Sequence, residues 1–345
     1  MIGRYRTHQL WLAFCLVTLG LAALLQGRGD PRLRRSADLT KPIPPTKENP
    51  KSAYDYYVSA VACESRGELD QAMADYNESI QLDQRNADVY VRRGMLYQSR
   101  GDLVKALADQ TEAIRVDPKN VYALANRASA WQTLEEWDKA AVDYTAAIDV
   151  SPNNDSLFVS RASLWQMTGE TGKAIDDLSQ AIRINPQESD YFLRRAYFRH
   201  LASDVPGAMQ DYAEAIRLNP QSADAFVNRG TLRHAESDFE NALEDFDQAI
   251  RLDPRMGAAF VARATLHLDD GHPDLALADF EQASRLNSLT AQDYYCRGTI
   301  WLQKQDFEKA LADFDEALRL DPKFTEAQVM RAFTEIAKGK QVEAK

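Results

Sequence analysis

The sequence predicts an all-α solenoid, in which short helices repeat along the chain and pack on their neighbours. Three observations support this prediction. A closing proline recurs at intervals of 34 residues, each unit contains two apolar patterns of helical period, and very small residues occupy two fixed positions in every unit. Because such a unit can bury its apolar face only against its neighbours, the array as a whole forms one domain.

Eight units fill residues 53–324 without a break in phase. The closing proline stands at Pro118, Pro152, Pro186, Pro220, Pro254 and Pro322, whereas Gln84 and Ser288 replace it in the other two units. The units are residues 53–86, 87–120, 121–154, 155–188, 189–222, 223–256, 257–290 and 291–324. Residues 325–345 begin a ninth unit, and we expect them to form a capping helix and a tail.

The first segment, residues 1–25, is predicted to hold the protein at a membrane. After a basic flank, residues 10–25 carry no charge and are rich in leucine and alanine. Their length lies between that of a signal-peptide core and that of a membrane-spanning helix. More arginines follow the run than precede it, which would keep the repeats on the cytoplasmic side. We therefore expect a single-pass anchor, and the alternative is export after cleavage of a signal peptide.

Residues 26–52 form a predicted linker between this segment and the repeats. The linker is basic and contains five prolines, which favour an extended, partly polyproline chain. They are Pro31, Pro42, Pro44, Pro45 and Pro50. The expected role of the linker is to let the repeats extend away from the first segment.

Each unit is predicted to hold two helices, and residues are numbered here by their place in the unit. In the sixth unit, the first helix is expected over residues 224–236 and the second over residues 239–252. The eighth place holds only Ala or Gly and the twentieth only Ala, so two helices can approach closely there. Pro206 and Pro273 fall in the first turn of a second helix, where proline costs little.

The spacing of small residues, aromatic residues and closing proline, seen in RGTIWLQKQDFEKALADFDEALRLDP (residues 297–322), resembles the tetratricopeptide repeat family. The resemblance covers residues 53–324 and extends into residues 325–338. It implies antiparallel helix pairs that stack into a right-handed superhelix. It also implies an inner groove that holds peptides or partner proteins.

A second periodic feature is a row of arginines at the seventh place and a row of aspartates at the twenty-third. The first unit has Ser59 instead of arginine, and Arg331 in the ninth has no aspartate after it. Pairing each aspartate with the arginine 18 residues later would leave neither end unmatched, so we predict a ladder of ion pairs between successive repeats. The alternative is an arginine row that binds acidic ligands. Representative pairs of the predicted ladder are Asp75 with Arg93, Asp177 with Arg195, and Asp313 with Arg331.

Composition argues against several classes of function. The formal net charge is −11, and because residues 1–52 contribute +6, the remainder carries −17, which disfavours nucleic-acid binding. No phosphate-binding glycine loop, nucleophile motif or metal-binding motif occurs, so we predict neither enzymatic activity nor a cofactor. His200 and His234 occupy equivalent places in adjacent repeats, but two histidines without a third ligand do not make a metal site.

The predicted groove comprises places two, five, six, nine, twelve and thirteen of each first helix, which point away from the packing face. These places combine apolar, hydroxyl, amide and imidazole groups, which suit a protein or peptide segment. We expect Asn126, Tyr197, His200, Asn228 and His234 to be free of core packing. The resemblance would require lysines for binding heat-shock chaperone tails, and these are absent. The candidate binding residues are Asn126, Ser129, Gln132, Gln166, Leu193, Tyr197, His200, Val227, Asn228, Thr231 and His234.

Together these features predict a membrane-tethered adaptor that binds a partner protein in its groove. One alternative is a structural subunit of a membrane complex that uses its outer face. The other is a regulatory subunit of an enzyme. The sequence identifies no particular partner.

Overall fold

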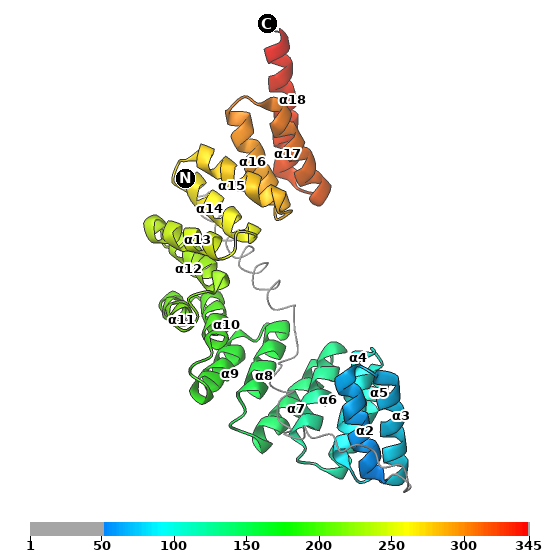
Figure 1. Ribbon diagram of the computed structural model, residues 1–345. Coiled ribbons are helices and arrows are strands. Elements are labelled where there is room, and N and C mark those ends of the chain that lie inside the picture. Colours follow the sequence, from blue (N-terminus) through cyan, green and yellow to red (C-terminus); the bar gives the residue numbers. More distant parts are fainter. Residues whose placement is uncertain (1–51, 344–345) are drawn as a thin grey trace. The chain divides into compact units, whose positions relative to one another are not determined.

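The computed structural model describes residues 52–343, all of whose regular structure is helical (Figure 1). The all-α prediction is therefore confirmed. The predicted anchor in residues 10–25 and nearly all of the predicted linker lie outside the described residues. Within residues 52–343, none of the helices combines the length and the apolar character that crossing a membrane requires.

The described residues form two compact units, residues 52–198 and 199–343. The helices that begin in the first unit are α2 (Ala53–Arg66), α3 (Leu69–Leu82), α4 (Ala87–Ser99), α5 (Leu103–Val116), α6 (Val121–Thr133), α7 (Trp137–Val150), α8 (Asp155–Thr168), α9 (Thr171–Ile184) and α10 (Ser189–Leu201). Those of the second unit are α11 (Val205–Leu218), α12 (Ala223–Ala235), α13 (Phe239–Leu252), α14 (Gly257–Asp269), α15 (Pro273–Arg285), α16 (Ala291–Gln303), α17 (Phe307–Leu320) and α18 (Thr325–Glu343).

Two helices fall in each 34-residue repeat, and they pack most closely at the small residues predicted for this purpose. In the sixth repeat, a Cβ atom added to Gly230 would lie 2.8 Å from Cε1 of Phe246. In the eighth, a Cβ atom at Gly298 would lie 2.8 Å from Cε1 of Phe314. The alanines at the twentieth place are fully buried. The aromatic ring on the second helix thus occupies the space that a side chain at the eighth place would need.

The turn between the two helices of a repeat has one backbone conformation throughout. The residue at the fifteenth place has positive φ, in the left-handed region that favours glycine. Glycine fills this place in four repeats, but other residues adopt the same conformation at Glu135, Ser203, Ser237 and Gln305. Pro206 and Pro273 lie in the first turn of α11 and α15, as predicted.

The turn between repeats varies at Ser288, where the closing proline is missing. Helix α15 ends at Arg285, Asn287 adopts a φ of 54°, and the Ser288 amide donates to the Ala283 carbonyl at 3.0 Å. Helix α16 nevertheless begins in phase at Ala291, capped by Thr290 and Asp293. The turn at Ser288 thus differs while the repeat register is preserved. The turn at Gln84, which also lacks the proline, keeps the extended C-cap found at Asp117.

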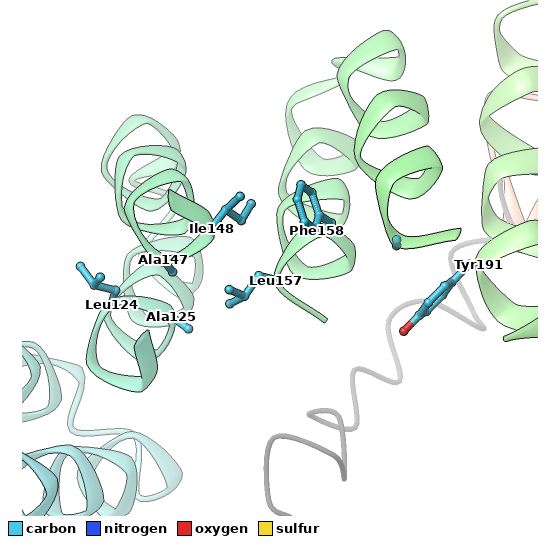
Figure 2. Close-up of a cluster of buried hydrophobic side chains, with 8 residues drawn as sticks. Leu124, Ala125, Ala147, Ile148, Leu157, Phe158 and Tyr191 are labelled. Carbon is cyan, nitrogen blue, oxygen red and sulfur yellow. The ribbon is translucent and has the colours of Figure 1, made fainter. Parts of the chain in front are cut away.

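The core is a series of apolar clusters, each shared by neighbouring helices. Figure 2 shows one of them, in which Leu124 of α6, Ile148 of α7, and Leu157 and Phe158 of α8 are buried together with Tyr191 of α10. The Tyr191 hydroxyl lies 2.9 Å from Oδ2 of Asp155 at the start of α8. Side chains from three consecutive repeats thus meet in one cluster, which ties each repeat to the next.

Candidate functional site: the first-helix face

The candidate site is the first-helix face, defined as places two, five, six, nine, twelve and thirteen of the first helix in each repeat. The structure divides the predicted binding residues into two groups. Those that keep partial exposure are Asn126, Ser129, Gln132, Gln166, Leu193, His200 and Asn228. Those that are buried are Tyr197, Val227, Thr231 and His234. The prediction that Tyr197 and His234 are free of core packing is therefore wrong.

Tyr197 is a core residue of the first unit. Its ring meets Phe198 edge-on at 5.4 Å between centroids, in a cluster that includes Ala162, Ala174 and Leu178. Burial raises the pKa of the Tyr197 hydroxyl. The side chain fills space between repeats, so truncating it would open a cavity.

His234 and Thr231 are likewise engaged in the second unit. Nε2 of His234 lies 3.0 Å from Oδ2 of Asp269 in the following repeat, and the imidazole ring packs edge-on against Phe239. The Thr231 hydroxyl donates to the Val227 carbonyl at 2.8 Å. These contacts show that a residue at place nine or twelve can be covered by its own helix and by the next repeat.

His200 differs from His234. It is half-buried, and its Nδ1 atom is buried without a hydrogen-bond partner among the described residues. Burial lowers the pKa of His200, and the charge of Glu236 opposes that change. Among residues 52–343, no group of three His, Cys, Asp or Glu side chains is arranged to hold a metal ion.

The first unit leaves more of the first-helix face open. Met95, Tyr122 and Met167, at places nine, two and thirteen, are exposed. Asn126 and Gln166 are half-buried, and neither side chain forms a hydrogen bond with another described residue. Flexible thioethers, an aromatic ring and two available amides are suited to burying side chains and gripping a backbone.

The exposed Met95, Tyr122 and Met167 were not among the predicted binding residues. The helical angle places them on the predicted face, but the prediction selected no residue at places two and thirteen and none in the second repeat. Polar contacts also link consecutive first helices, since the Gln98 amide donates to the Ser129 hydroxyl at 3.1 Å. Gln132 accepts from the Tyr144 hydroxyl at 3.3 Å. Ser129 and Gln132 therefore already have partners within the protein.

The ion pairs join residues within one repeat, so the prediction that they bridge successive repeats is wrong. Arg127 donates to both carboxylate oxygens of Asp143 at 2.7 Å, from Nε and Nη2. Asp177, predicted to pair with Arg195, accepts instead from Arg161 at 2.7 and 2.9 Å. The same 16-residue spacing joins the following pairs: Arg93 with Asp109, Arg229 with Asp245, Arg263 with Asp279, and Arg297 with Asp313.

The third nitrogen of the arginine does reach the preceding repeat, but at the twenty-fifth place. Nη1 of Arg93 donates to Asn77 at 2.8 Å, and Nη1 of Arg161 donates to the Thr145 hydroxyl at 2.9 Å. Nη1 of Arg195 donates to the Ser179 hydroxyl at 3.0 Å. The guanidinium group therefore donates hydrogen bonds both to the aspartate of its own repeat and to a polar side chain of the preceding repeat.

The ends of the array find other partners. Asp75 accepts from the Ser59 hydroxyl at 2.6 Å and from the Gln71 amide at 2.8 Å. Arg331 contacts Asp315 in the preceding repeat and pairs with Glu335 on its own helix. Arginines so engaged are not available as a row that binds acidic ligands.

The buried aspartates receive a second donor from the eleventh place, which sequence reasoning missed. The indole of Trp165 donates to Asp177 at 2.9 Å. Arg199 donates to Asp211 at 2.9 Å, and Arg233 donates to Asp245 at 2.8 Å. A buried carboxylate that accepts several charge-assisted or polar hydrogen bonds is satisfied electrostatically. This explains how an aspartate can be buried between the two helices of a repeat.

Comparisons with known proteins agree with this architecture. A model described as tetratricopeptide repeat matches residues 168–223, 202–257 and 261–323, and a second model of that description matches residues 87–120. A model described as TPR repeat matches residues 62–101. Together these matches span more than half of the chain. A search of curated protein sequences gives no match.

Several solved structures are similar to this chain in fold. A tetratricopeptide repeat protein from Parabacteroides merdae aligns with a TM-score of 0.56 and 24% identity, over 72% of this chain and 98% of that one. The C-terminal part of a TPR repeat-containing protein from Cytophaga hutchinsonii gives 0.55 and 17%, over 69% and 97%. PilW, described as a type IV pilus biogenesis factor, gives 0.53 and 18%, over 62% and 98%.

Proposed function

Because the chain belongs to the tetratricopeptide repeat family, whose members serve as protein-interaction scaffolds, we propose that it is an adaptor that binds a segment of another protein. The binding surface is the first-helix face of repeats two to four. The observation that carries the proposal is the exposure of Met95, Tyr122 and Met167 beside the available amides of Asn126 and Gln166. The fold is typically a non-catalytic scaffold, which is consistent with this role.

Two features support an extended or helical protein segment as the ligand. Exposed apolar groups spaced along successive helices can each bury one ligand side chain, and the amides can bond its backbone. The methionines adapt to different side-chain shapes. A ligand of this kind needs no cofactor and no preformed deep pocket.

The test compares two variants, each with three exposed side chains truncated to alanine. Met95→Ala, Tyr122→Ala and Met167→Ala together alter the first-helix face, whereas Leu82→Ala, Val104→Ala and Val142→Ala alter exposed residues on second helices. Both sets should leave helicity and melting nearly unchanged, since exposed sites usually change stability by about 0.5 kcal/mol or less. Crosslinking followed by pull-down from intact membranes should recover the partner with the second-helix variant and lose it with the first.

The opposite ranking would replace this proposal with a second candidate. Val104 and Val142 are strongly exposed apolar residues on α5 and α7, and they favour a structural subunit that assembles through its second helices. Loss of partner recovery only in the second-helix variant would establish that function. The proposal further includes attachment to a membrane through residues 10–25, on the grounds of their uncharged, apolar sequence and the basic flanks.

A further inference from the structure

The last helix, α18, exposes an apolar stripe. Val329, Phe333 and Ile336 are 60%, 57% and 58% exposed. Their spacing places them on one face of the helix. Two charged residues, Glu326 and Lys340, are exposed and extend the same face at its two ends. At 100° per residue, all five lie within about 80° of helix circumference.

The opposite face of α18 is firmly held, so the stripe is not exposed through detachment of the helix. Ala327 and Thr334 are fully buried. Lys338 pairs with Glu308 at the start of α17, at 2.6 Å. Arg331 contacts Asp315 near the end of α17. The stripe is thus presented on a rigid support.

The same places are covered in the sixth repeat. Val329, Phe333 and Ile336 occupy places five, nine and twelve of the ninth repeat. In the sixth repeat those places hold Val227, Thr231 and His234, all buried, with His234 bonded to the next first helix. A face at these places can therefore pack against another helix, as it does in the sixth repeat.

We propose that the stripe pairs with the same stripe of a second copy of this chain, with the two α18 helices antiparallel about a two-fold axis near Phe333. Glu326 and Lys340 each lie seven residues from Phe333. The antiparallel arrangement therefore sets Glu326 against Lys340 of the partner subunit at both ends of the contact. A parallel arrangement would set like charges together. Self-complementarity of this kind is what a two-fold interface requires.

The contact is a single pair of helices, so the resulting dimer is weak. It is smaller than a standard stable interface, and a dissociation constant on the order of 10 μM or weaker is expected. Such an equilibrium responds to local concentration. Bringing many copies of the chain together therefore favours pairing.

Directed disulfide formation tests both the surface and its orientation. The full chain, with Cys15, Cys63 and Cys296 replaced by alanine, carries either Glu326→Cys or Lys340→Cys, and the two proteins are mixed under mild oxidation. Antiparallel pairing predicts crosslinks between the two different chains and few within either preparation alone. A control pair at exposed turn residues, Gln84→Cys mixed with Lys119→Cys, reports random collision and should crosslink far less.

A disruptive substitution completes the test. Phe333→Asp, added to both crosslinking chains, should reduce the yield about tenfold or more, because it buries a charge at the centre of the contact. Leu134→Asp, at an exposed turn residue outside the first-helix face, should not change the yield, and circular dichroism should show unchanged helicity in both. Crosslinks formed only between identical sites would overturn the antiparallel arrangement. A yield no higher than that of the control pair, or no effect of Phe333→Asp, would overturn the proposal itself.

Discussion

At the scale of single residues, the buried aspartate of the twenty-third place shows how this fold accommodates charge. Asp143 and Asp177 are both buried, and each accepts two hydrogen bonds from the guanidinium group of an arginine in its own repeat. Burial of a carboxylate is costly unless charge and hydrogen bonds compensate it. The arginine supplies both, and its remaining nitrogen reaches the repeat before it.

We predict strong coupling between Arg127 and Asp143. Removing one member of such a pair should destabilise the protein by about 3–5 kcal/mol, because the other charge is left buried and unpaired. A double-mutant cycle with Arg127→Ala and Asp143→Ala should therefore give a coupling energy above ~1 kcal/mol in urea unfolding. The control cycle pairs Arg127 with Asp109, at the 18-residue spacing. Equal or larger coupling there would contradict the pairing seen in the structure.

A second residue-scale prediction concerns Asp293, which occupies a place held by apolar residues in most other repeats. Asp293 is almost fully buried, one of its oxygens bonds Thr290, and Oδ1 has no partner among the described residues. Burial raises the pKa of this carboxyl above its usual value. Because the folded-state pKa is the higher one, the charged form opposes folding, and stability falls as the pH rises through that pKa.

The Asp293→Asn variant should not show this loss. Its stability relative to the native chain should therefore increase as the pH rises from about 4 to 7, measured by urea unfolding at each pH. Asp75→Asn, which alters a carboxylate with two donors, is the control. A constant difference between Asp293→Asn and the native chain across this range would mean that the carboxyl titrates normally.

At the scale of helices, the sequence predicts the elements well and their contacts less well. Helices predicted over residues 224–236 and 239–252 are found at Ala223–Ala235 and Phe239–Leu252. The helical period of the apolar residues and the small residues at two places suffice to predict these helices, because both can be read within a single repeat. Burial of Tyr197 depends on side chains of the preceding repeat, and burial of His234 depends on the following one. The helical angle of a residue does not predict these contacts.

The error in the ion-pair prediction has a similar origin. The prediction assumed that every aspartate of the twenty-third place needs an arginine of the seventh place as its partner, and the reverse. Ser59 satisfies Asp75 by a hydroxyl, and Asp315 and Glu335 satisfy Arg331. A hydroxyl at one end and two carboxylates at the other thus satisfy the unmatched residues. These partners lie outside the two rows, so the spacing of the rows does not predict them.

Close helix packing gives the prediction that belongs to this scale. Gly230→Ala should destabilise the protein by about 1–3 kcal/mol, because the new methyl group would overlap the ring of Phe246. Gly172→Ala in α9 is the matched control, since no atom lies within 4 Å of its added Cβ. That change should stabilise by about 0.5–1 kcal/mol through backbone entropy. Thermal melting measures both, and a stabilised Gly230→Ala protein would contradict the close approach.

At the scale of the whole molecule, the chain combines an acidic repeat array with a basic N-terminal segment. We predict that residues 10–25 remain attached and hold the protein at a membrane. N-terminal sequencing of the mature protein should then find the original start, and deletion of residues 10–25 should move the protein from the membrane to the soluble fraction. A mature terminus between residues 21 and 40 would instead indicate cleavage and export.

The placement of the ion pairs also affects how an array of this kind can change in length over generations. Arg93, Arg127 and Arg161 each pair with the buried aspartate of their own 34-residue unit, so such a unit carries its compensating charge with it. Duplication or deletion of one internal unit therefore leaves no buried aspartate without its arginine, and the first unit satisfies its own Asp75 through Ser59 and Gln71. Copy number can drift by whole repeats, and new surfaces can arise by recombination before any compensating substitution has occurred.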